Sequence, residues 1–298
     1  MRRRRIKLSA DKIALTVFSY VLISFLAIFC VLPFLMILSG SLTQEQAIFR
    51  YGFSLIPPVF SLEAYQIVWE APSSLLRAYW VTVNTTFFGT LSGLILVSMT
   101  AYVLFRKDFP WRNSIAFYFF FTTLFSGGLV PWYILMIRYL NLRDNPMVLV
   151  LPYLFNVFHI IIMRSFMRGI PDSLVEAAKI DGAGDFRIYW KIMLPLSKPA
   201  LATIGLFIAL NLWNEWFHAM LFINDSRLFP LQFHLHRVLN SMQFAAQAAR
   251  EANIPMPRMP TESFKLVMTV LTTGPILFLY PFVQRYFIKG ITIGAVKG

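Results

Sequence analysis

The chain has 298 residues, of which 57% are hydrophobic and only 14% are charged. This balance leaves too little polar surface to cover a water-soluble globule of this size, so it excludes an ordinary soluble domain and predicts a membrane protein. The single cysteine, Cys30, excludes a disulfide framework or a cysteine-rich metal site within the chain. The formal charge of +13 does not indicate nucleic-acid binding, because the basic residues lie between apolar runs rather than on one soluble face.

Six stretches are nearly free of Asp, Glu, Lys and Arg. They cover residues 13–42, 78–105, 113–137, 145–163, 199–224 and 266–284. A helix needs roughly 20 apolar residues to cross a hydrocarbon core about 30 Å thick. We therefore expect an all-α integral membrane protein with six transmembrane helices within residues 13–288. The fourth and sixth stretches are the shortest and contain Pro146, Pro152, Gly274, Pro275 and Pro281, which predicts kinks or frayed ends there.

The distribution of Lys and Arg predicts the orientation in the membrane. With six spans both termini lie on one side, and the segments on that side hold 18 Lys and Arg against 9 on the other. Because cytoplasmic segments carry the excess, we expect the basic N-terminus (1–12) and the C-terminal tail (289–298) in the cytoplasm. The first apolar run is longer than that of a cleaved signal peptide, so it predicts an uncleaved anchor.

The long segments 43–77 and 225–265 then lie outside. They are either simple connectors or loops that cover a pore mouth or meet an external partner.

The inner segment 169–198 has the pattern of a short helix. Ser173 and Glu176 have the spacing of a capping box, in which each side chain satisfies a free backbone N–H at the helix start. Apolar residues follow, and Gly182 can take the left-handed conformation that ends a helix. A helix of about two and a half turns is marginal alone in water, so it must pack against the chain's own spans or another protein.

This segment resembles the EAA loop of the permease subunits of binding-protein-dependent ABC importers. The matching positions are Glu176, Ala177, Ala178, Gly182, Ile192, Leu194 and Pro195. Three other segments resemble the carbohydrate branch of that family, in particular lipoprotein-dependent oligosaccharide permeases: Phe60-Ser-Leu-Glu-Ala-Tyr65, Leu212-Trp-Asn-Glu-Trp-Phe217 and residues 286–298. The resemblance implies a type I importer permease fold, in which the loop helix is a cytoplasmic coupling helix that docks on a separate ATPase subunit.

The resemblance also implies the partners. They are a second permease subunit in a heterodimer, a dimer of ATPase subunits that bind ATP and Mg, and an extracytoplasmic solute-binding protein, assembled at the bacterial inner membrane. The chain itself has no G-x-x-x-x-G-K-[ST] phosphate loop, so the ATPase must be another polypeptide. His234 and His236 form only a weak ligand pair, and we expect no catalysis, metal or cofactor in this chain.

Six residues of the fifth stretch are candidates for the substrate pathway: Asn211, Trp213, Asn214, Glu215, Trp216 and His218. An ionisable group within a span costs several kcal/mol, so Glu215 needs a partner or a wet cavity. Asn211, Asn214, Glu215 and His218 are spaced to share one face of a continuous helix, with the two tryptophans as flat surfaces for pyranose rings. Hydrogen bonding between helices and an interfacial aromatic belt explain the same residues equally well.

Asn84, Asn156 and His159 are weaker pathway candidates, for which packing is the favoured interpretation. The basic tail either anchors the chain or, as in related maltose-type permeases, contacts the ATPase dimer.

The expected cargo is a sugar or oligosaccharide, and the nine outer Lys and Arg would favour acidic cargo such as alginate or pectin fragments. The alternative from another class is a self-contained ion-coupled carrier or channel, with Glu215 and His218 as the relay.

Overall fold

The computed structural model describes residues 10–70, 72–252 and 261–295. Within these ranges the chain is helical, and the β-structure is limited to one isolated antiparallel bridge between Thr43 and Phe60. Two compact units divide the chain: residues 1–70 with 242–273, and residues 71–241 with 274–298.

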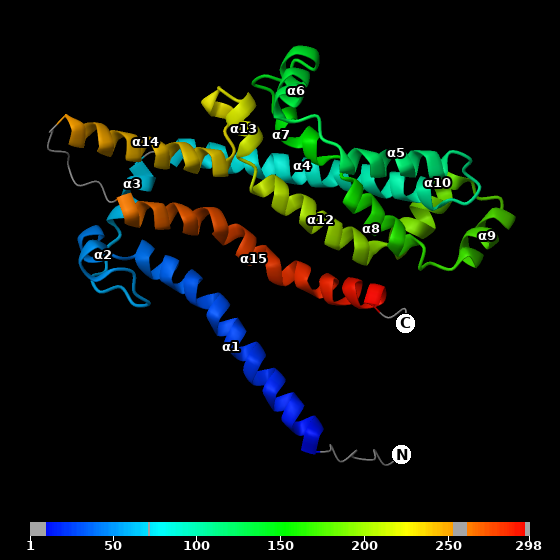
Figure 1. The fold of residues 1–298 in the computed structure, drawn as a ribbon, viewed down its shortest axis with the longest axis horizontal. Coiled ribbons are helices and arrows are strands. Elements are labelled where there is room, and N and C mark those ends of the chain that lie inside the picture. Colours follow the sequence, from blue (N-terminus) through cyan, green and yellow to red (C-terminus); the bar gives the residue numbers. More distant parts are fainter. Residues whose placement is uncertain (1–9, 71, 253–260, 296–298) are drawn as a thin grey trace. The chain divides into compact units, whose positions relative to one another are not determined.

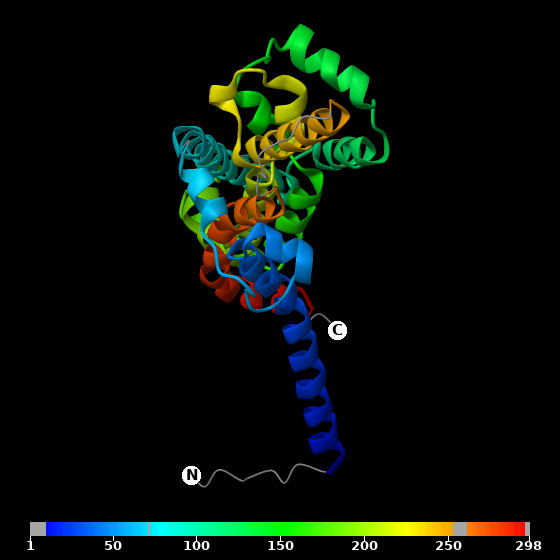
Figure 2. The same cartoon turned by 90° about the vertical axis from the view of Figure 1, so that its left-hand side faces the viewer.

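The first unit is built on α1, which covers Ala10–Ser41 (Figure 2, blue). Most large apolar side chains of α1 from Leu15 to Leu38 are exposed, as expected for a helix that faces lipid or another subunit, and Leu32, Met36 and Ile37 are half-buried. The unit also contains α2 (Glu45–Tyr51) and α3 (Glu63–Glu70). The helices α14 (Leu231–Glu251) and α15 (Thr261–Ala295) contribute their parts within residues 242–273.

A buried carboxylate joins α2 to the start of α15 within this unit. Glu45 is 8% exposed and accepts hydrogen bonds from the backbone N–H groups of Glu262 at 2.9 Å and Ser263 at 2.8 Å. The Ser263 hydroxyl donates to the same carboxylate at 2.8 Å. Glu45 therefore caps the first turn of a helix that begins more than 200 positions later in the chain.

The second unit is organised around α4 (Pro72–Phe105), which packs along α12 (Lys198–Trp213) and α8 (Val157–Met167) (Figure 1). Glycines on α4 allow this close approach, because a Cβ on Gly89 would lie 2.6 Å from Leu212 Cδ1. Val97, Met163 and Ile204, one from each helix, are fully buried in the core between them.

The remaining helices of this unit are short and several form bent pairs. They are α5 (Arg112–Leu124), α6 (Leu129–Ile134), η1 (Leu135–Tyr139), α7 (Met147–Val150), η2 (Leu151–Tyr153), α9 (Asp172–Ile180), α10 (Asp185–Ile188), η3 (Tyr189–Met193), α11 (Leu194–Leu196), α13 (Phe217–Phe222) and η4 (Ser226–Leu228). The chain bends by 115° between α5 and α6, by 48° between η2 and α8, and by 81° between α11 and α12 (Figures 1 and 2).

Six uninterrupted spans are not what the described residues show. Two helices, 14–41 within α1 and all of α4, are each long and apolar enough to cross a membrane, and the number rises to five if each bent pair is one span. The third stretch is broken at residues 125–128 and the fifth at 214–216. Pro152 lies in η2, beside the bend predicted for the fourth stretch, whereas α15 stays helical through Gly274 and Pro275.

The predicted outer segments and the tail contain more helix than expected. Segment 43–77 holds α2, α3 and the start of α4, and segment 225–265 holds η4 and the 21-residue helix α14. The backbone of α15 reaches Ala295, so most of the predicted tail is helical, and residues 296–298 lie outside the described part. An apolar run marks only the part of a helix that faces the membrane. The helix itself extends beyond that run as long as its backbone hydrogen bonds continue.

Candidate functional site

The loop between α8 and α12 contains the helix that its sequence predicts, but its start is different. Pro171 occupies the N-cap position with extended backbone angles (φ −59°, ψ 130°), and α9 begins at Asp172 without a side-chain cap. The predicted capping box is therefore wrong. Because Pro171 starts the helix early, Ser173 already has a helical position, from which it cannot act as the N-cap.

The end of α9 is as predicted. Gly182 has φ +78°, in the left-handed region. The Ala183 N–H donates to Ala178 O at 2.9 Å, and the Gly182 N–H donates to Lys179 O at 3.0 Å. These two bonds form a Schellman motif, which satisfies two carbonyls that the helix end would otherwise leave free.

The two faces of α9 differ. Val175 and Ala178 are buried and belong to the core of the second unit, whereas Glu176 and Ala177 are exposed. Ile180 is 87% exposed at the last turn. A helix of nine residues with one packed face and one exposed face that includes a large apolar side chain is suited to docking against another protein.

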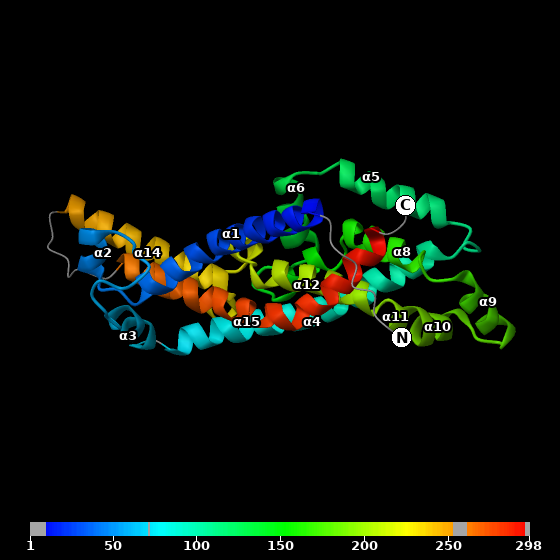
Figure 3. The same ribbon diagram turned by 90° about the horizontal axis from the view of Figure 1, so that it is seen from below.

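The segment after α9 leads back to the spans. Ile192 and Leu194 are half-buried against the core that holds Val175 and Ala178, and Pro195 is exposed in α11, next to the bend before α12. The seven positions that match the EAA loop therefore lie in one continuous structure, in which some are packed against the core and others are exposed. α9 and α10 lie close together at one end of this unit (Figure 3).

A group of charged side chains beside α9 was not anticipated from the sequence. Arg106, just after α4, is 8% exposed and donates to the carboxylates of Asp108 and Asp185 and, at 3.0 Å, to the Tyr102 hydroxyl. Lys179 of α9 donates to Asp108 at 3.0 Å. Hydrogen bonds from Arg106 and Lys179 hold the pKa of the Asp108 carboxyl well below its usual range. In the sequence, Arg106 and Lys179 stand out only as basic residues that set the topology, because Asp185 lies 79 positions from Arg106.

The polar stripe predicted on the fifth stretch does not share one helix face. α12 ends at Trp213, and α13 begins at Phe217. Glu215 is 2% exposed in the gap and accepts hydrogen bonds from the Tyr153 hydroxyl, from His218 N at 2.6 Å and from His218 Nδ1 at 3.0 Å. The carboxylate satisfies the free N–H of the next helix, which favours a break over a continuous helix.

The six pathway candidates consequently differ in exposure. Trp213 and Glu215 are buried and His218 is half-buried, whereas Asn211, Asn214 and Trp216 are exposed. The Trp216 ring stacks on His236 with centroids 5.1 Å apart. Gln232 donates to Asn214 Oδ1 at 3.2 Å, so α14 adds polar groups beside this exposed cluster.

The side chains of the three weaker pathway candidates interact with other residues of the chain. Asn84 donates to Trp80 O at 2.7 Å, and Asn156 caps α8 by accepting from Phe158 N at 2.9 Å. The buried ring of His159 stacks on Phe207 with centroids 6.1 Å apart. These contacts agree with the packing interpretation.

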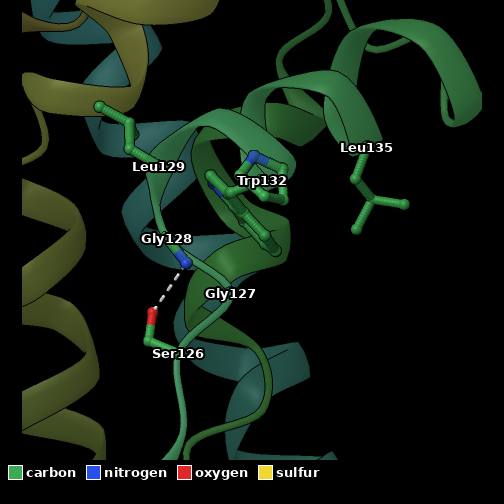
Figure 4. Close-up of a pocket in the computed structure, with 7 residues that line it drawn as sticks. Ser126, Gly127, Gly128, Leu129, Trp132 and Leu135 are labelled. Carbon is green, nitrogen blue, oxygen red and sulfur yellow. Dashed lines mark hydrogen bonds between the residues drawn. The ribbon is translucent and has the colours of Figure 1, made fainter.

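A pocket of about 490 Å³ lies at the break between α5 and α6 (Figure 4). It is lined by Ser126, Gly127, Gly128, Leu129, Pro131, Trp132 and Leu135. Gly128 has φ +85°, and its N–H donates to the Ser126 hydroxyl at 3.2 Å. The Ser-Gly-Gly run within an apolar stretch is the sequence signal that could have predicted this break.

A helical protein with apolar helices of membrane length and a glycine-ended helix in the loop between α8 and α12 has the features of the membrane component of an importer. The chain belongs to the family described as "Binding-protein-dependent transport system inner membrane component", whose model matches residues 10–293. It is therefore an inner-membrane transport component with a type I importer permease fold, and not an enzyme.

Individual relatives cover almost the whole chain. "Protein LplC" of Bacillus subtilis is 40% identical over 268 residues, which is 90% of each chain. The "Polygalacturonan/rhamnogalacturonan transport system permease protein YtcP" of Bacillus subtilis is 38% identical over 275 residues, 91% of this chain and 94% of that protein. A similar solved structure belongs to a bacterial ABC transporter involved in the import of the acidic polysaccharide alginate. It has a TM-score of 0.80 and 30% identity, and covers 95% of this chain and 99% of the other.

Proposed function

We propose that this chain is one of two permease subunits of an ATP-driven importer and forms half of the pathway for acidic oligosaccharides. The observation that carries the mechanism is α9, with Val175 and Ala178 packed on the core and Glu176, Ala177 and Ile180 free to meet a partner. The cargo class is supported by the relatives, since one is named for polygalacturonan and the solved relative for alginate, and both polymers carry carboxylates.

In the proposed arrangement the chain has six spans, with both termini in the cytoplasm, and α9 is the cytoplasmic coupling helix. The bent pairs and α15 would each count as one span. A dimer of separate ATPase subunits, which bind ATP and Mg, would hold the exposed face of α9, and the C-terminal end of α15 would lie near them. Ile192, Leu194 and Pro195 would connect the docked helix to α12.

A solute-binding protein would deliver the sugar to the outer segments, which include α2, α3 and α14. The exposed side chains of Asn211, Asn214 and Trp216 would face the pathway, with amides for sugar hydroxyls and an indole for a pyranose ring. Glu215 would hold the backbone turn that presents them. Its carboxylate is buried and accepts three hydrogen bonds, which disfavours the relay role required by a self-contained carrier.

The test is reconstitution of this chain with a second permease, the ATPase pair and the solute-binding protein in liposomes. We expect ATP-dependent uptake of oligogalacturonate or alginate fragments, and little uptake of neutral oligosaccharides of the same length. Uptake by this chain alone, without ATPase, would favour the carrier. ATP-driven uptake of neutral sugars only would contradict the acidic cargo while leaving the importer mechanism intact.

A further inference from the structure

The end of α4 is bonded to the segment after α9 by a row of polar side chains. Ser98, Tyr102 and Arg106 are four positions apart, so they lie on one face of the helix and its continuation. Ser98 and the Tyr189 hydroxyl are 2.8 Å apart, Tyr102 donates to the Asp185 carbonyl at 3.3 Å, and Arg106 donates to the Asp185 carboxylate. This row fixes α10 and η3 against the last two turns of α4.

A second set of contacts fixes α9 itself to the same place. Asp108 accepts hydrogen bonds from Arg106 and from Lys179, so one carboxylate connects the end of α4 to the last turn of α9. Between these charges, Val175 and Ala178 pack in the core that also contains Phe105. α9 therefore cannot move away from the end of α4 without breaking both apolar and ionic contacts.

Arg106 is the buried member of this ion-pair network, and its partners Asp108 and Asp185 are 53% and 65% exposed. The Arg106 side chain is 10% exposed and serves two carboxylates, and charge-assisted bonds of this kind are stronger when shielded from water. The pair between Lys179 and Asp108 is more open, with side chains 44% and 53% exposed, but it shares its carboxylate with Arg106 and so belongs to this network. The pair between Lys107 and Asp172, 77% and 49% exposed, stands apart from that network, and isolated surface pairs contribute little.

We propose that Arg106, Asp108 and Lys179 form a positioning joint that transmits displacement of α9 directly to α4. The proposal rests on the proposed function, in which α9 is the coupling helix. The covalent route from α9 runs through residues 181–197 to α12, and the joint adds a second route to the helix that packs along α12. Salt-bridge networks and rigid helices are the physical elements that carry such coupling.

The joint can be tested in the reconstituted complex with three variants, each of which replaces one lysine. Lys179→Met removes the link to Asp108, Lys179→Arg keeps it, and Lys191→Met removes an exposed lysine of η3 that makes no ion pair within the described ranges. Because the Lys179 side chain is 44% exposed, the first variant should fold and copurify with its partners. ATP hydrolysis and sugar uptake are measured together, per assembled complex.

We expect Lys179→Met to lower the sugar carried per ATP by about five-fold or more, the range of ordinary allosteric couplings. Lys179→Arg and Lys191→Met should keep the wild-type ratio, and Asp108→Asn should act in the same direction as Lys179→Met. A wild-type ratio in Lys179→Met, or an equal loss in Lys191→Met, would overturn the joint. Failure of the proposed function is distinguishable, because the wild-type complex would then show no ATP-driven uptake at all.

Discussion

Replacing Gly182 tests whether the end of α9 matters for transport. The residue has φ +78°, a conformation that costs an L-residue with a Cβ roughly 1–2 kcal/mol. A Cβ there would meet nothing within 4 Å, so the cost of Gly182→Val is backbone strain alone, without a steric clash. The strain is relieved when the backbone leaves this conformation, which breaks the two Schellman bonds and releases the end of α9.

The expected result is uncoupling with the complex still assembled. A penalty of about 1–2 kcal/mol corresponds to a factor of roughly 5–30 in the population of the ordered helix end. We expect sugar carried per ATP to fall by up to about this factor in Gly182→Val. Gly182→Asn should lose less, because Asn visits the left-handed region more readily than other residues with a side chain.

Gly184→Val is the matched control for this experiment. It adds the same side chain two positions away, where φ is −71° and no atom lies within 4 Å. Uptake and ATP hydrolysis are measured in the same liposomes, with copurification of the partner subunits as the assembly check. An equal transport ratio in Gly182→Val and Gly184→Val would refute the reasoning, because the two variants differ in backbone strain rather than in bulk.

Two further substitutions test the packing of each unit by thermal unfolding in detergent. Glu45→Ala leaves the N–H groups of Glu262 and Ser263 without their acceptor and should cost about 1–3 kcal/mol, whereas Glu63→Ala, at an exposed position of α3, should leave the melting temperature unchanged. Gly89→Val places a Cβ 2.6 Å from Leu212 Cδ1 and should cost about 1–3 kcal/mol by overpacking, and an unchanged melting temperature would mean that α4 and α12 are not packed this closely.

Local patterns predicted the parts of the fold that depend on local physics. The long apolar runs of α1 and α4 were identifiable because a span without charges has few alternatives to a membrane helix. The end of α9 was identifiable because Gly182 supplies a left-handed residue at the position where the periodic pattern stops.

Tertiary contacts decided the features that the sequence reasoning missed. The spacing from Asn211 to His218 fits one helix face, but Tyr153, which lies 62 positions from Glu215, holds the carboxylate in a turn. Likewise, Arg106 is an ordinary basic residue near a span until Asp185 is placed beside it. Periodicity describes one element at a time, so it contains no information about a partner from another element.

The helix breaks in the second unit differ in how the hydrogen bonds of their backbone groups are made. Irregular backbone at membrane depth is tolerated only where protein shields it or water reaches it. At two breaks a side chain of the break itself caps the following helix, namely Asn156 for α8 and Glu215 for α13. At the break before α6, the Ser126 hydroxyl accepts from the Gly128 N–H, and the loop borders the pocket of about 490 Å³. At the first two breaks a side chain of the break thus supplies an acceptor for the next helix, whereas at the third the backbone turns at Gly128 beside the pocket.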